Sequence, residues 1–128
     1  MKLNRRNFIS ASAGIAATMS SPMVFGASRP KVVVIGGGAG GATAARYIAK
    51  DSKGAIDVTL VEPTRSYYTC FFSNLYLGGF RDFDSIGHSY GKLASDYGIN
   101  VVHDWAVDVD SSGKTVSLAG GGTVNYDK

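Results

Sequence analysis

The sequence predicts an α/β fold in which a parallel β-sheet packs against helices. The first observation is a continuous apolar run over residues 31–35 that leads directly into the glycine-rich segment 36–41. The second is a helix-forming stretch, followed by another apolar run that ends on Glu62. Strand, glycine turn, helix, strand and terminal carboxylate follow one another in the order of a dinucleotide-binding βαβ unit.

Three glycines of the motif have separate expected roles. Gly36 allows the tight turn out of the first strand, Gly38 lets the backbone approach a pyrophosphate, and Gly41 lets the helix pack closely on the sheet. The helix N-terminus offers free N–H groups and a positive dipole end to phosphates. Glu62 is in position to accept hydrogen bonds from ribose hydroxyls. These residues predict a dinucleotide site.

The kind of dinucleotide is indicated by the helix. Ala45 is a small residue four positions after Gly41, where the helix must pass close to the strand, and it favours FAD, although NAD-binding domains share most of the pattern. The alternative is a glycine-rich turn in another kind of α/β protein. The flanking strand, helix and carboxylate favour the dinucleotide site.

The remaining elements follow from hydrophobic periodicity and turn residues. We expect strands over 31–35, 56–61 and 99–103, helices over 40–50 and 86–97, and an antiparallel meander over 105–109, 115–118 and 124–126. This is a Rossmann-like FAD-binding domain: a parallel sheet with helices, plus a β-meander. Three parallel strands leave an incomplete core. We therefore expect residues 29–128 to be the N-terminal part of an FAD/NAD(P)-binding domain, truncated at its C-terminal end.

Residues 1–28 have the features of a twin-arginine export signal. Arg5 and Arg6 are followed by a weakly hydrophobic stretch rich in Ala, Gly and Ser, and then by small residues suited to cleavage. The stretch is too short to span a membrane. Three of the thirteen basic residues lie in this signal, so residues 29–128 carry ten basic and ten acidic side chains. A neutral domain without a basic stripe gives no indication of nucleic-acid binding.

Cys70 is the only cysteine, and it lies shortly after the strand that ends in Glu62. In doubly wound folds the chemistry gathers beyond the carboxyl ends of the parallel strands. A cysteine there can face a flavin ring, where its thiolate can attack the ring or exchange with a disulfide partner. The alternative is a small hydrophobe buried among aromatic side chains. Position alone does not separate the two.

Several segments together resemble the flavoprotein subunit of flavocytochrome c sulfide dehydrogenase. They are the twin-arginine leader and the segments 32–41, 60–63, 67–70 and 101–104, of which Tyr-Tyr-Thr-Cys at 67–70 is the most specific. The resemblance covers nearly the whole chain. It implies a periplasmic enzyme that uses FAD to oxidise sulfide to sulfur or polysulfide and passes the electrons to a separate c-type cytochrome subunit.

The resemblance also implies roles for individual residues. Gly36, Gly38, Gly41 and Glu62 would bind FAD, and Ala106 and Val107 would lie along the adenine through backbone contacts. Cys70 would be the sulfide-reactive thiol, forming a redox-active disulfide near the flavin with a second cysteine far along the chain. These 128 residues hold no second cysteine, so we expect them to be inactive alone. They hold no C-x-x-C-H motif either, which assigns any haem to another polypeptide.

Two other functions remain open. One is a sulfide:quinone oxidoreductase, or another two-dinucleotide-domain flavoprotein of the pyridine nucleotide-disulfide type, which shares the FAD domain. The other is a non-catalytic nucleotide-binding fragment. His88 and His103 lack the spacing of metal ligands, and we assign them no role.

Overall fold

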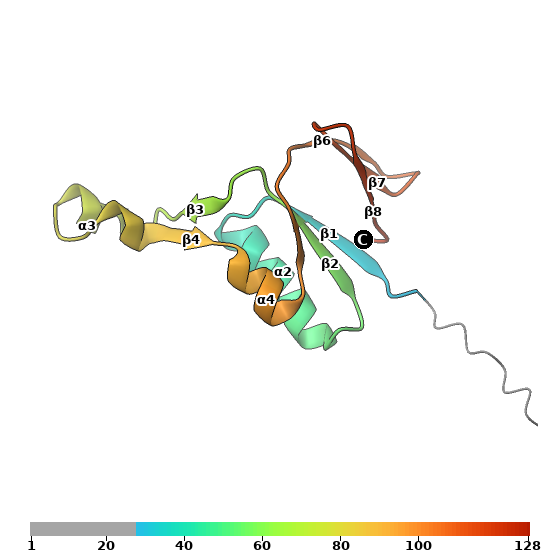
Figure 1. The fold of residues 1–128 in the computed structure, drawn as a ribbon, viewed down its shortest axis with the longest axis horizontal. Coiled ribbons are helices and arrows are strands. Elements are labelled where there is room, and N and C mark those ends of the chain that lie inside the picture. The colour runs from blue at the N-terminus through green and yellow to red at the C-terminus, as the bar shows by residue number, and fades with distance from the viewer. Residues whose placement is uncertain (1–27) are drawn as a thin grey trace, which may run out of the picture.

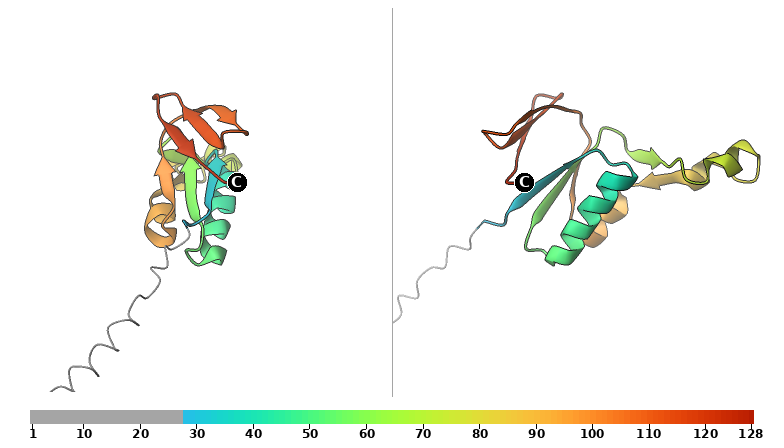
Figure 2. Two further views of the ribbon diagram at one scale, coloured as in Figure 1. Left: turned by 90° about the vertical axis from the view of Figure 1, so that its right-hand side faces the viewer. Right: turned by 180° about the vertical axis from the view of Figure 1, so that it is seen from behind.

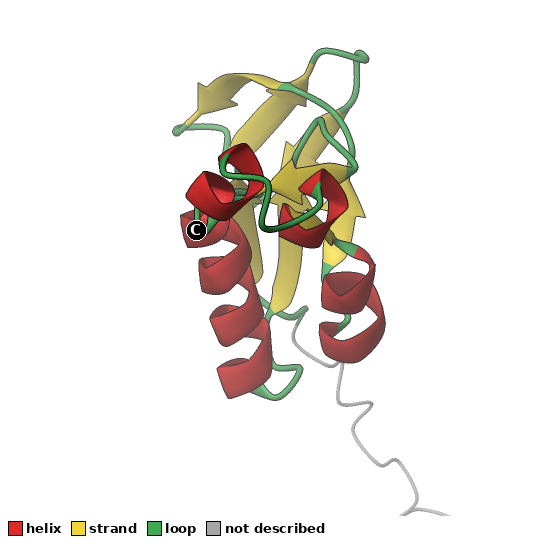
Figure 3. Ribbon diagram, turned by 90° about the vertical axis from the view of Figure 1, so that its left-hand side faces the viewer, coloured by secondary structure: helices red, strands yellow, loops and turns green. Residues whose placement is uncertain are grey.

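The computed structural model describes residues 28–128, and most of the predicted export signal lies outside this range. The centre is a parallel sheet in the order β1-β2-β5, formed by β1 (Lys31–Ile35), β2 (Asp57–Val61) and β5 (Asn100–Val102). Helices α2 and α4 lie side by side on one face of the sheet, and strands β6, β7 and β8 lie on the other side (Figures 2 and 3). The α/β class predicted from the sequence is confirmed.

Helix α2 (Ala39–Ser52) connects β1 to β2 and packs closely on the sheet. Ala45 has no exposed surface, which agrees with the expectation of a small residue where the helix crosses the strand. The helix ends at Lys53, whose left-handed backbone (φ 51°) lets its N–H donate to the carbonyl of Lys50. The buried core beneath the two helices is formed by Ala45, Val58, Leu60, Tyr90 and Ile99.

The chain between β2 and α4 projects from the domain as an arm, defined here as residues 66–89 (Figure 1). Its base is an antiparallel pair, β3 (Ser66–Tyr68) with β4 (Gly87–Ser89), and its tip holds α3 (Ser73–Leu77) and the 3-10 helix η1 (Phe83–Ile86). Cys70 lies in this arm, between β3 and α3.

The prediction of one helix over residues 86–97 is wrong at its N-terminal end. Helix α4 spans Gly91–Tyr97 only, because residues 87–89 pair with β3 as strand β4. Gly87 contributes to this outcome, since glycine in a helix interior is unfavourable. The C-terminal end of the helix is where the sequence predicts it: Gly98 adopts a left-handed conformation and caps α4.

The antiparallel meander is confirmed, with β6 (Ala106–Asp110), β7 (Thr115–Leu118) and β8 (Thr123–Asn125) in that order. The last two residues run along the outer edge of β1: Asp127 N–H donates to Lys31 C=O at 2.8 Å, and Val33 N–H donates to Lys128 C=O at 3.0 Å. Over residues 28–128, no helix has the length and hydropathy needed to cross a membrane.

Candidate functional site

The glycine loop, residues 36–41, turns the chain from β1 into α2. Gly36 adopts φ 95°, a conformation that favours glycine, and its N–H donates to the carbonyl of Val61 at 2.8 Å. The Ala42 N–H makes the first bond of the helix, to the carbonyl of Gly38 at 2.9 Å. The N–H groups that precede Ala42 have no helical acceptor, so the N-terminus of α2 offers donors to an anionic group.

The glycines of the loop differ in whether a side chain would have room. A Cβ on Gly41 would overlap the carbonyl oxygen of Gly36, and a Cβ on Gly37 would lie 2.5 Å from the Tyr90 hydroxyl. A Cβ on Gly38 would meet no atom beyond its chain neighbours closer than 3.9 Å. Packing within the chain therefore explains Gly37 and Gly41, whereas Gly38 leaves open space at the start of α2. The loop fits a ligand that approaches the backbone closely, as a pyrophosphate does.

Glu62 follows β2 and is bonded directly to the glycine loop. Its Oε2 accepts a hydrogen bond from Gly37 N–H at 2.6 Å, and its Oε1 accepts from Thr64 N–H at 2.9 Å and Thr64 Oγ1 at 2.6 Å. Partial burial alone would raise the pKa of Glu62. The bonds from Thr64 and Gly37, together with nearby His103, outweigh burial and lower that pKa. An ionised carboxylate has about four acceptor sites, so Glu62 retains capacity for a further donor such as a ribose hydroxyl.

Two residues without a predicted role border this site. The Tyr90 hydroxyl donates to Gly37 C=O at 3.0 Å, and His103 Nδ1 lies 3.1 Å from the backbone carbonyl oxygen of Glu62. Burial, and secondarily the charge of Glu62, raise the pKa of Tyr90, so its hydroxyl remains a donor at neutral pH. The position of His103 directly after the third parallel strand could have indicated that it lies near the site. No local pattern indicated Tyr90, which lies 53 residues from Gly37.

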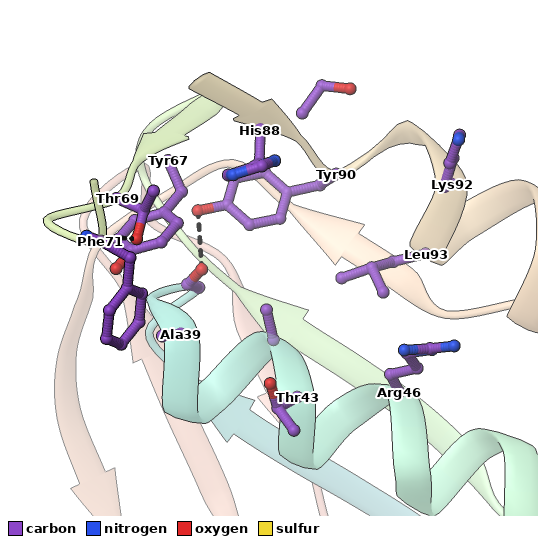
Figure 4. Close-up of a pocket in the computed structure, with 13 residues that line it drawn as sticks. Ala39, Thr43, Arg46, Tyr67, Thr69, Phe71, His88, Tyr90, Lys92 and Leu93 are labelled. Carbon is purple, nitrogen blue, oxygen red and sulfur yellow. Dashed lines mark hydrogen bonds between the residues drawn. The ribbon is translucent and has the colours of Figure 1, made fainter. Parts of the chain in front are cut away.

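A cavity of about 490 Å³ opens beside the N-terminus of α2 (Figure 4). Its walls come from the glycine loop with α2, from the arm, and from the segment that leads from β4 into α4. Three basic side chains are among its lining residues, Arg46, His88 and Lys92. The volume is within the usual range for small-molecule sites. The free N–H groups at the start of α2 therefore border a cavity of ligand size.

Cys70 lies in the chain between Thr69 and Phe71, which both line this cavity. Its carbonyl oxygen accepts hydrogen bonds from the N–H of Ser73 at 3.2 Å and the Ser73 hydroxyl at 2.8 Å, which fixes the backbone at the start of α3. The thiol is exposed. The alternative of a small hydrophobe buried among aromatic side chains therefore does not describe this structure.

Ala106 and Val107 lie at the start of β6, in a separate sheet from β1 and β2. Ala106 pairs with Leu118 and Asp108 pairs with Ser117, so the register skips Val107. A β-bulge of this kind leaves the backbone of the extra residue outside the ladder, and bulges are frequent beside functional sites. The structure thus bonds Glu62 to the glycine loop directly, while no hydrogen bond joins Ala106 or Val107 to that loop.

The fold and the loop geometry together define a dinucleotide-binding domain. A family model described as pyridine nucleotide-disulphide oxidoreductase matches residues 30–128. The chain belongs to the pyridine nucleotide-disulphide oxidoreductase family.

Similar proteins make the comparison more specific. The sulfide dehydrogenase (flavocytochrome c) flavoprotein chain of Chlorobaculum thiosulfatiphilum is 54% identical over 44 residues, covering 34% of this chain and 90% of that sequence. This match confirms the resemblance seen in the sequence.

Solved structures show the same fold in larger proteins. The sulfide:quinone oxidoreductase of Aquifex aeolicus matches with a TM-score of 0.68 and 26% identity, over 77% of this chain and 23% of that one. The water-forming NADH oxidase of Lactobacillus brevis matches with a TM-score of 0.69 and 27% identity, over 77% of this chain and 24% of that one. The chain thus spans about a quarter of the length of these structures.

Proposed function

We propose that the full-length protein binds FAD at the glycine loop and oxidises sulfide to sulfur or polysulfide. The observation that carries the cofactor proposal is the open space at Gly38, next to a loop that is bonded to Glu62. The sulfide proposal is supported by the sulfide dehydrogenase flavoprotein relative. Bound FAD would supply a two-electron acceptor, and the residues below would hold it.

Each proposed cofactor residue has a role that follows from its position in the fold. Gly36 and Gly41 shape the turn, and Gly38 admits the pyrophosphate to the N-terminus of α2, where N–H groups and the helix dipole favour negative charge. Glu62 accepts the ribose hydroxyls. Ala106 and Val107 offer backbone groups to the adenine, a role supported by the bulge that leaves Val107 out of the ladder.

Cys70 supplies a thiol beside the flavin. Support comes from its exposure and from its place between two residues of the cavity wall. A thiolate at this position can bond to the cofactor or exchange with a disulfide partner, and both reactions require an accessible sulfur. Acid precipitation of the parent protein and of a Cys70→Ser variant separates these two reactions.

The electron acceptor is proposed to be a c-type cytochrome subunit. The relative from Chlorobaculum is the flavoprotein chain of a flavocytochrome c. A second candidate acceptor is a quinone, which is favoured by the match to a sulfide:quinone oxidoreductase. Purified full-length protein should reduce cytochrome c in a sulfide-dependent manner. Reduction of a soluble quinone but not of cytochrome c would replace the first proposal by the second.

We further propose that residues 1–28 direct the protein to the periplasm by the twin-arginine route. Arg5 and Arg6 are the residues that support it, and they lie outside the described part of the chain. Changing both to Lys keeps the charge but removes the planar guanidinium groups. We expect cell fractionation to show that the paired Lys variant no longer accumulates in the periplasm. Normal accumulation would mean that the leader is of another kind.

A further inference from the structure

The glycine loop is held at Gly37 by two side chains from distant parts of the chain. The Gly37 N–H donates to Glu62 Oε2 at 2.6 Å, and its C=O accepts from the Tyr90 hydroxyl at 3.0 Å. The two groups belong to consecutive peptide units. Both peptide planes on either side of Gly37 are therefore fixed, one by each side chain.

The second of these peptides joins Gly37 to Gly38, the residue at the start of α2. A trans peptide is planar, so the C=O of Gly37 and the N–H of Gly38 point in opposite directions from the same rigid unit. Whatever fixes the Gly37 carbonyl therefore also fixes the Gly38 N–H. Gly38 is the N-cap residue of α2, and space around its Cα is open.

We infer that Tyr90 is a positioning residue for the dinucleotide: its hydrogen bond to Gly37 C=O holds the Gly38 N–H toward the pyrophosphate. This inference rests on the proposed binding of FAD at the glycine loop. Tyr90 does not touch the cofactor in this arrangement. It acts through the peptide between residues 37 and 38, and it reduces the reorganisation needed when the phosphates bind.

Tyr90 is packed closely against the glycine loop. Only 5% of Tyr90 is exposed, and the phenol reaches the loop because Gly37 has no side chain: a Cβ there would lie 2.5 Å from the hydroxyl oxygen and 2.7 Å from two ring carbons. Gly37 does not have a positive φ, so backbone conformation does not require glycine at this position. The phenol ring therefore provides the reason for glycine at position 37.

Tyr97 provides a matched control. Its hydroxyl also bonds between α4 and α2, accepting a hydrogen bond from Arg46 Nε at 2.9 Å, and its helix leads on from Tyr90. Tyr97 bonds to Arg46 in α2 and not to the glycine loop. Tyr97→Phe therefore removes a phenol hydrogen bond and leaves the contact at Gly37 in place. A purely structural role for Tyr90 would make any loss of FAD affinity follow the loss of stability in both Phe variants.

The test is a titration of full-length apoprotein with FAD. Tyr90→Phe should weaken FAD binding roughly three- to tenfold, the effect of one neutral hydrogen bond, while Tyr97→Phe leaves affinity unchanged. In a Gly37→Ala background, where the added Cβ displaces the phenol, Tyr90→Phe should cause no further loss, because the two changes break one interaction. Thermal unfolding of each apoprotein shows whether it is folded.

The outcomes separate this inference from the proposed function. Absence of FAD binding by the parent protein overturns the proposed cofactor site. Binding by the parent, with equal affinity in folded Tyr90→Phe, overturns the role of Tyr90 alone. Equal losses in Tyr90→Phe and Tyr97→Phe would also overturn it, because they would show that affinity follows the general stability of the helix pair.

Discussion

The glycine loop is held by hydrogen bonds from other parts of the described chain, whereas the arm is largely exposed. The loop is bonded at both peptide units of Gly37, and its neighbour Tyr90 is buried. The arm contains one close aromatic stack, Tyr68 on Phe83 with centroids 4.5 Å apart, but it leaves most of its large apolar side chains exposed. A side chain added at Gly37 or Gly41 should therefore alter ligand binding and stability together. A change at the tip of the arm should leave the stability of the domain nearly unaffected.

The largest expected effect tests Gly38, a glycine that neither close packing nor a positive φ explains. Gly38→Val should abolish flavin uptake, because its side chain would fill the space that the pyrophosphate needs. The fold should persist, since the new Cβ meets nothing nearby closer than 3.9 Å. Flavin absorbance of the purified full-length protein measures the effect. Gly91→Val is a matched control, because a Cβ at that helix start also meets one atom at 3.9 Å. Undiminished flavin in Gly38→Val would exclude the assignment.

The next largest effect tests whether the arm carries chemistry. Cys70→Ser should leave FAD binding and folding nearly intact, because the thiol is exposed and the two side chains are similar in size. Sulfide-dependent reduction of cytochrome c should collapse, since a serine hydroxyl is a much weaker nucleophile than a thiol and cannot form a disulfide. Flavin content and turnover are measured on the same sample.

Acid precipitation of the parent protein and of the Cys70→Ser variant identifies the reaction of the thiol. Flavin that precipitates with the parent alone indicates a bond between Cys70 and the cofactor. Flavin released from both, with a disulfide-linked Cys70 peptide in the parent, indicates disulfide exchange. Near-normal turnover per bound flavin in the variant would contradict any catalytic role.

A smaller effect tests the bond between the loop and Glu62. Glu62→Ala should weaken FAD binding by about 1.5–3 kcal/mol, the range for hydrogen bonds to a charged group. The pKa of Glu62 is lowered in the folded protein from 4.5, so its ionised form stabilises the fold fully above pH 4.5. That contribution is lost as the pH falls below 4.5 through the lowered pKa. Denaturant titrations over this range should show the pH dependence in the parent and a smaller one in Glu62→Ala; identical profiles would contradict it.

The smallest effect is expected at the tip of the arm. Leu77 is 82% exposed, so Leu77→Ser should change the free energy of unfolding of the described domain by no more than about 0.5 kcal/mol. Leu60→Ala is the control, because Leu60 is fully buried and its truncation should cost about 2–5 kcal/mol. Chemical denaturation of both variants gives the comparison. A large loss in Leu77→Ser would show that the arm is packed more tightly than its exposure indicates.

The sequence predicted the parts of the fold that are specified locally. The first strand, the glycine turn, the helix and the strand ending in Glu62 are consecutive, and their hydrophobic periods and turn residues are readable in short windows. The bond between Gly37 and Glu62 joins residues only 25 apart within that unit. The meander was equally readable, because clusters such as Gly120–Gly122 separate its strands.

The parts that the sequence did not predict depend on distant pairing. Strand β4 is short, and it forms because residues 87–89 meet β3, so a helix was predicted where a strand begins. Tyr90 lies within the range of that predicted helix, and no role was predicted for it. Its contact with Gly37 spans 53 residues and has no periodicity to indicate it. The sequence also did not predict that the arm is exposed, because a segment rich in aromatic residues is typical of a buried core.

The two edges of β1 also differ in the order in which the chain can complete them during synthesis. The inner edge is joined by β2 within the first βαβ unit, so it can pair soon after that unit leaves the ribosome. On the outer edge, Lys31 N–H bonds to the Asp127 carboxylate, which is 96 residues away. A nascent chain would therefore have its glycine loop and Glu62 in place while the outer edge of β1 is still bare. An uncovered strand edge can pair with other chains. The interval between these two events is a period of aggregation risk, and prompt elongation shortens it.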